Sequence, residues 1–74
     1  MVELVKVAII LDYPTAGMLQ SLLCVEGLHP LEVQDSPHVG FNGDDFGYYV
    51  EVPVPEAAKA VALIREAGYA RNIL

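Results

Sequence analysis

The stretch LVKVAIILDYPTAGMLQSLLCVEG, residues 4–27, decides how the rest of this chain can be arranged. It begins with eight residues that are apolar except for Lys6. A strand with so few polar positions is typical of the middle of a sheet, where both faces are covered. Strict alternation predicts two apolar faces. One holds Val5, Val7, Ile9 and Leu11, and the other holds Leu4, Ala8 and Ile10.

The remainder of the stretch predicts a helix over residues 15–26. Asp12 can accept hydrogen bonds from the first free amides, and Pro14 suits a first-turn position whose amide is unpaired in any case. Gly27 follows as a left-handed stop. Apolar side chains recur at helical spacing at Ala16, Leu19, Leu22, Leu23 and either Val25 or the polar Glu26.

Two further strands are predicted downstream. Residues 28–34 alternate weakly, and Pro30 assigns them to a sheet edge because it cannot donate to a ladder. Residues 35–45, DSPHVGFNGDD, predict a hairpin loop with its tight turn at Asn42 and Gly43. Residues 46–54 alternate with a period of two, which predicts a strand with one face on the core. The core side would hold Phe46, Tyr48, Val50, Val52 and Val54, with Tyr49 on the opposite face.

A second helix is predicted to open at Pro55 and Glu56 and to stop at Gly68, and Ile73 and Leu74 suggest a short last strand. The order β-α-β-β-α-β predicts one domain over residues 1–74. We expect an α+β, ferredoxin-like sandwich with an antiparallel sheet and both helices on one face. The first and third strands would be central.

Composition narrows the function. The chain has 74 residues, of which 54% are hydrophobic and 19% are charged, so some apolar surface is left outside and we expect a homo-oligomer. The net charge of −6 argues against nucleic acid and anionic membranes as partners. No apolar run reaches the roughly 18 residues of a membrane span and no leader pattern is present, which predicts a soluble cytoplasmic protein.

Cys24 is the single cysteine, so an internal disulfide is excluded. It falls in the apolar pattern of the first helix, and we expect it to be buried as a small hydrophobe. One cysteine is too few for a cysteine-based zinc site, and we expect no cofactor.

Polar groups that could form a site gather in the 35–45 loop, at Asp35, His38, Asp44 and Asp45. Oxygen ligands of this kind suit a hard cation, and a histidine could join them for a transition metal. Their spacing matches no calcium loop and no paired-histidine pattern. We therefore expect a solvated acidic turn and no metal site.

Four other residues are candidates for chemistry. His29 lies where the first helix ends, where a protonated form is favoured, although a surface histidine is the commoner case. Asp12 could act as an acid, but capping already accounts for it. Tyr13 and Tyr49 could stack on a ligand, because alternation leaves Tyr49 outside the core.

Three segments carry a family resemblance: ELVKVA at residues 3–8, LQSLLCVEGL at 19–28 and VEVPVPEAAKAVALI at 50–64. On these the chain resembles a family of small bacterial domains of unknown function, described as prokaryotic signal-transducing proteins. The resembling positions are mostly apolar and transfer no catalytic residue. The resemblance implies a ferredoxin-like fold and a regulatory role.

Three functions remain open. The first is a regulatory or binding module whose copies pair through exposed sheet and bind a small molecule or a partner protein. The second is a small oligomeric enzyme in which His29 or His38 works with Asp12 or Asp45 as an acid–base pair between subunits. The third is an assembly subunit without a ligand. The sequence identifies neither the ligand, the partner nor the number of subunits.

Overall fold

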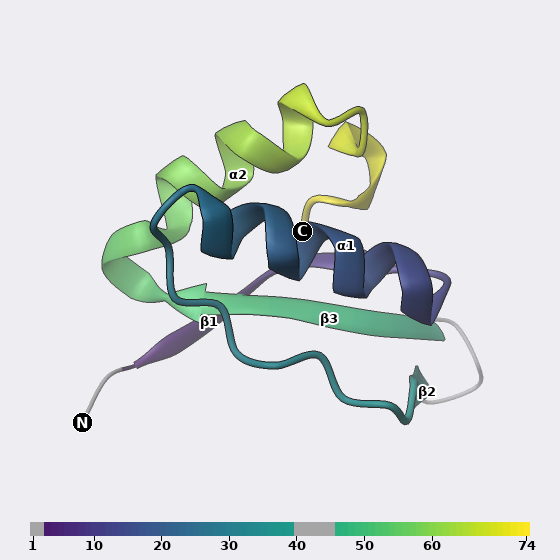
Figure 1. The fold of residues 1–74 in the computed structure, drawn as a ribbon. Helices are drawn as coiled ribbons and strands as arrows, with labels where there is room; N and C mark the ends of the chain where they lie inside the picture. The colour runs from purple at the N-terminus through teal and green to yellow at the C-terminus, as the bar shows by residue number, and fades with distance from the viewer. Residues whose placement is uncertain (1–2, 40–45) are drawn as a thin grey trace.

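The computed structural model describes residues 3–39 and 46–74, and it shows a three-stranded antiparallel sheet with two helices on one face (Figure 1). The strand order is β1-β3-β2, so β3 lies in the middle. This arrangement confirms a small α+β fold. The elements are β1 (Leu4–Ile10), α1 (Tyr13–Val25), β2 (His38–Val39), β3 (Phe46–Pro53), the 3-10 turn η2 (Val54–Glu56), α2 (Ala57–Glu66) and the 3-10 turn η3 (Ala70–Asn72).

β1 contains a bulge that changes which residues share a face. Its pairing with β3 shifts between Lys6 and Ala8, so one extra residue is accommodated there. Beyond the shift, Ala8 and Ile10 lie on the side of the helices, whereas Ile9 lies opposite Tyr49 on the other face. Strict alternation along the whole strand was therefore wrong, and Leu11, expected on a covered face, is 68% exposed.

α1 begins where its capping residue predicts. The Asp12 carboxylate accepts a hydrogen bond from the backbone N–H of Thr15 at 2.9 Å, which confirms the cap. The helix starts at Tyr13, two residues earlier than expected, with Pro14 in its first turn. Gly27 follows with φ +87°, which confirms the left-handed stop.

Cys24 is exposed, so its predicted burial was wrong. The buried side of α1 is narrower than the apolar pattern suggested, because Ala16, Leu19 and Leu23 already cover the sheet. Cys24 is one position beyond Leu23, and each helical residue turns by about 100°, so its side chain leaves the covered face. Val25 is also outside, with 83% of its surface exposed.

The core lies between the helices and the sheet. Both strands β1 and β3 and both helices contribute apolar side chains to it, together with two residues of the connecting segment after α1. The buried residues are Val7, Ala8, Ile10, Ala16, Leu19, Leu23, Leu28, Val33, Val50, Val52, Ala60 and Ile64.

Among residues 3–39 and 46–74, no helix has both the length and the apolarity needed to cross a membrane.

Residues 28–34 do not form the predicted edge strand. The backbone N–H of Leu31 donates to the carbonyl of Glu51 in β3 at 2.9 Å, but the N–H of Val33 turns away and donates to Oε1 of Gln20 on α1 at 2.7 Å. Val33 is buried at that point. The segment therefore leaves β3 after Leu31 and follows the helix layer instead.

Pairing with β3 resumes at β2, where His38 lies opposite Gly47 and Val39 lies opposite Phe46. His38 was expected in a loop and is in a strand. The predicted turn at Asn42 and Gly43 lies outside the described residues. Phe46, expected on the core side, is 46% exposed, and so is Val54 at 49%, because it has left β3 for η2.

The last residues reach the outer edge of β1. Gly68, with φ +98°, ends the second helical segment as predicted. Ile73 forms a single antiparallel bridge with Ala8, and the N–H of Leu74 donates to the carbonyl of Val7 at 3.0 Å. The expected last strand is thus reduced to one bridge that follows the turn η3.

Candidate binding groove at the edge of β3

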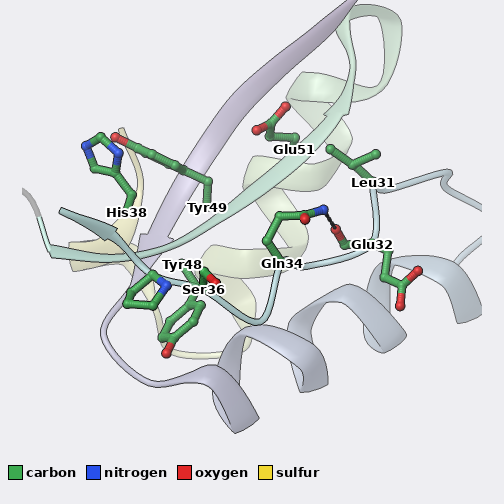
Figure 2. Close-up of a pocket in the computed structure, with 9 residues that line it drawn as sticks. Leu31, Glu32, Gln34, Ser36, His38, Tyr48, Tyr49 and Glu51 are labelled. Carbon is green, nitrogen blue, oxygen red and sulfur yellow. Dashed lines mark hydrogen bonds between the residues drawn. The ribbon is translucent and has the colours of Figure 1, made fainter. Parts of the chain in front are cut away.

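A groove of about 150 Å³ lies between β3 and the segment that connects α1 to β2 (Figure 2). It is bounded on one side by β3 and on the other by the part of the connecting segment that departs from the sheet. Aromatic, amide, hydroxyl and carboxylate side chains all contribute. The lining residues are Leu31, Glu32, Gln34, Ser36, Pro37, His38, Tyr48, Tyr49 and Glu51.

The groove exists because the ladder beside β3 is interrupted. Backbone groups along one edge of a strand repeat every second residue. The Glu51 carbonyl faces the segment, since it accepts from Leu31, and Gly47 faces it at the other end, where it pairs with His38. Tyr49 lies midway between these two positions, so its N–H and C=O face the groove. In the described part of the chain, no hydrogen bond from the segment reaches these two groups.

Aromatic side chains line the outer end of the groove. The ring centroids of Tyr49 and His38 are 4.9 Å apart, with the planes tilted by 49°. Nζ of Lys6, from β1, lies 4.7 Å from the Tyr49 centroid. A cation at this distance is attracted by the ring quadrupole. Tyr49 is therefore half-buried between a histidine and an ammonium group, with only part of its surface open to solvent.

The charged side chains that line the groove are acidic. Glu51 and Glu32 supply carboxylates, and the lining contains no Lys or Arg. Lys6 lies directly across the sheet from Glu51, but among residues 3–39 and 46–74 no ion pair joins these two side chains. The side-chain amide of Gln34 donates to the carbonyl of Glu32 at 3.3 Å, a contact within the connecting segment that borders the groove.

His29 is positioned away from this groove, by a contact with Glu56. Nδ1 of His29 lies 2.7 Å from Oε2 of Glu56, and the backbone N–H of His29 donates to Oε1 at 2.7 Å. The hydrogen bond from the His29 side chain is the main cause that lowers the pKa of Glu56, followed by the one from the His29 backbone. His29 therefore joins the end of α1 to the start of α2.

Within one chain His29 and Asp12 have different partners, so a pairing of the two between subunits stays a prediction. Asp12 is occupied in capping α1, and its hydrogen bonds with Thr15 lower the pKa of its carboxyl group. Asp45 lies outside the described residues, as does Asp44, so the pairing of His38 with Asp45 stays a prediction. Among the residues that the structure describes, no group of three His, Cys, Asp or Glu side chains could hold a metal ion.

Tyr13 and Tyr49 do not share a site. The ring of Tyr13 lies 5.4 Å from that of Tyr48, and neighbouring strand residues point to opposite faces of a sheet, so Tyr13 and Tyr49 lie on opposite sides. Tyr13 borders a second hollow, beside Asp35.

Comparisons with protein families, with curated proteins and with solved structures found no match to this chain.

Sequence reasoning found two residues of the groove, His38 and Tyr49, and missed the rest. Glu51 had a usable signal, because the two-residue period of β3 places it on the same face as Tyr49. Gln34 and Ser36 had none, since their place in the groove depends on the departure of the segment from β3. That departure follows from the contact of Val33 with Gln20 on α1.

Proposed function

We propose that this protein is a small regulatory or binding module whose copies associate and which binds a small molecule in the groove beside β3. The observation that carries the proposal is the interrupted ladder. It turns the N–H and C=O of Tyr49 toward a hollow that also holds carboxylate and aromatic side chains. Binding sites typically combine a few convergent polar groups with such rings. The regulatory role is what the resemblance to prokaryotic signal-transducing domains implies.

A ferredoxin-like order belongs to the same proposal. In that order a fourth strand adds to the free edge of β1. The bridge between Ala8 and Ile73 and the hydrogen bond from Leu74 to Val7 lie at that edge, which supports the assignment. The two helices on one face are consistent with it (Figure 1).

Association is proposed to use the face of the sheet that carries no helix. The side chains on this face include Leu4, which is 42% exposed, and Ile9. Lys6 and Glu51 also lie there, directly opposite each other on neighbouring strands. A two-fold axis through the part of this face that carries Leu4 would form the same contact twice.

The test combines light scattering with a thermal-shift screen of amines, amino acids, nucleotides and divalent metals. We expect a mass twice the 8.0 kDa of one chain and a melting temperature that rises with ligand concentration. Tyr49→Ala should abolish the rise, whereas Tyr13→Ala, on the other side of the sheet, should retain it.

Each part of the proposal fails on a distinct result. A monomeric mass would overturn the association. A stable dimer whose melting temperature responds to no compound would overturn small-molecule binding and favour a partner protein. A rise that survives in Tyr49→Ala and is lost in Tyr13→Ala would move the site to the hollow beside Tyr13.

A further inference from the structure

We infer that the ligand of this groove is a small organic cation, a primary ammonium group carried on a body no larger than a single ring. The inference rests on the proposed function, because it names the class of molecule that the same groove would bind. Three independent properties of the groove support it: its size, its charge and its free backbone groups.

Size sets the upper limit. Pockets for drug-sized molecules begin at roughly 300 Å³, whereas a cavity of about 150 Å³ holds a molecule such as benzene. The groove beside β3 has about 150 Å³. A nucleotide or a peptide of several residues would extend out of the groove, whereas one ring or a short chain fits inside it.

The charges of the lining residues indicate the sign of the charge on the ligand. Two acidic residues, Glu32 and Glu51, are among the residues that line the groove, and no Lys or Arg is. The chain as a whole carries a net charge of −6, so its long-range field also attracts cations. Among the described residues Lys6 forms no ion pair with Glu51, and its ammonium group lies over the ring of Tyr49. An anionic ligand would meet these two acidic residues, and no Lys or Arg among the lining residues would compensate for them.

The backbone supplies the remaining recognition. An ammonium group has three N–H donors and needs acceptors for them. The C=O of Tyr49 faces the groove, and the Glu51 carboxylate is two residues along the same strand. The Lys6 ammonium already lies 4.7 Å from the Tyr49 centroid, so the ammonium group of the ligand would bind at the Tyr49 C=O and the Glu51 carboxylate and not over this ring. The ring of the ligand would then contact Leu31 and His38.

Three probes of one shape and different charge test the inference: benzylamine, benzyl alcohol and benzoate. Each is titrated into the protein while the backbone amide resonances of Tyr49 and Glu51 are followed by NMR. We expect benzylamine to shift both resonances at the lowest concentration, benzyl alcohol at a higher one and benzoate least. Glu51→Gln should weaken benzylamine by about fivefold, the contribution of one partly exposed ion pair.

Glu66→Gln is the matched control, because Glu66 is an exposed glutamate at the end of α2 and outside the groove. It changes the net charge by the same amount and should leave benzylamine binding unchanged. If Glu51→Gln fails to fold, Glu32→Gln removes the other carboxylate and is expected to act in the same direction.

The outcomes separate this inference from the proposed function. If benzoate or benzyl alcohol binds in the groove as tightly as benzylamine, the preference for a cationic ligand is refuted, and the groove is still a binding site. Equal weakening by Glu51→Gln and Glu66→Gln would reduce the effect to net charge and overturn recognition by Glu51. If the groove resonances respond to none of the probes and to no compound of the thermal screen, both proposals fail.

Discussion

His29 and Glu56 are 27 positions apart in the chain, yet both carboxylate oxygens of Glu56 are hydrogen-bonded to His29, each at 2.7 Å. One bond comes from the backbone N–H and the other involves the ring nitrogen Nδ1. The two contacts fix the turn after α1 against the 3-10 turn η2, which leads into α2. Hydrogen bonds to the charged form of a carboxylate favour that form, which is why the pKa of Glu56 is lowered.

The first prediction concerns the pH dependence of stability. Because the pKa of Glu56 is lower in the folded than in the unfolded chain, its contribution is complete above the ordinary value of 4.5 and is lost as the pH falls through the folded-state pKa. Glu56→Gln should lower the melting temperature at neutral pH and reduce its fall between neutral pH and about pH 3. Circular dichroism measures both. Glu66→Gln should keep the wild-type slope, and parallel curves for wild type and Glu56→Gln would contradict the prediction.

A second prediction concerns Gly47, whose φ is +152°. A Cβ at this position would lie 2.7 Å from the carbonyl oxygen of Ile10, and that oxygen belongs to the backbone of β1 and cannot easily move. Gly47→Ala should therefore lower the free energy of unfolding by about 1–3 kcal/mol, as measured by urea denaturation.

Gly17→Ala is the matched control for Gly47→Ala. Gly17 is inside α1, and an added Cβ there meets no atom within 4 Å. The same substitution should raise the free energy of unfolding by about 0.5–1 kcal/mol, because alanine loses less conformational entropy in a helix than glycine does. Equal effects at Gly47 and Gly17 would refute the close approach of β3 to β1.

A third prediction concerns Gln20, the acceptor for the buried Val33 amide. Gln20→Met keeps the side-chain length and removes the acceptor, so the N–H of Val33 is left unpaired in a partly buried place. We expect a loss of about 1–3 kcal/mol in the free energy of unfolding. Gln34→Met, which removes an exposed contact to Glu32, should change it by less than about 0.5 kcal/mol. A stability unchanged in Gln20→Met would mean that Val33 finds another acceptor.

The fourth prediction follows from the exposure of Cys24. Its thiol should react with a disulfide reagent in the native protein about as fast as in the urea-unfolded chain, and Cys24→Ser should alter the free energy of unfolding by less than about 0.5 kcal/mol. Leu23→Cys in the Cys24→Ser background is the comparison, since Leu23 is fully buried. That thiol should react only through unfolding. Slow labelling of native Cys24 would contradict the orientation of α1.

Local signals predicted the ends of the helical segments. Asp12 caps α1 through its carboxylate, and Gly27 ends the helical segment through its positive φ. Both effects depend only on neighbouring residues, and the structure confirms both. The short-range alternation of β3 was also sufficient to place Val50 and Val52 in the core and Tyr49 outside it.

Contacts between distant segments were not predictable in the same way. Whether residues 28–34 pair with β3 depends on the donation from Val33 to Gln20, and a weak alternating pattern does not reveal it. The bulge before Ala8 changes the register of β1, and no residue type in that stretch indicates a bulge. Since the groove depends on the departure of that segment, the sequence could name His38 and Tyr49 as candidates but could not assemble the site around them.

The pairing of β1 with β3 has a consequence for synthesis on the ribosome. Leu4 lies opposite Pro53 and Ile10 opposite Tyr48, so β1 leaves the ribosome well before β3, the strand with which it pairs. Closing a loop of this length precedes any gain from the sheet, and such non-local pairing slows folding. During that interval the apolar side chains of β1 are exposed on the nascent chain, where they are accessible to chaperones.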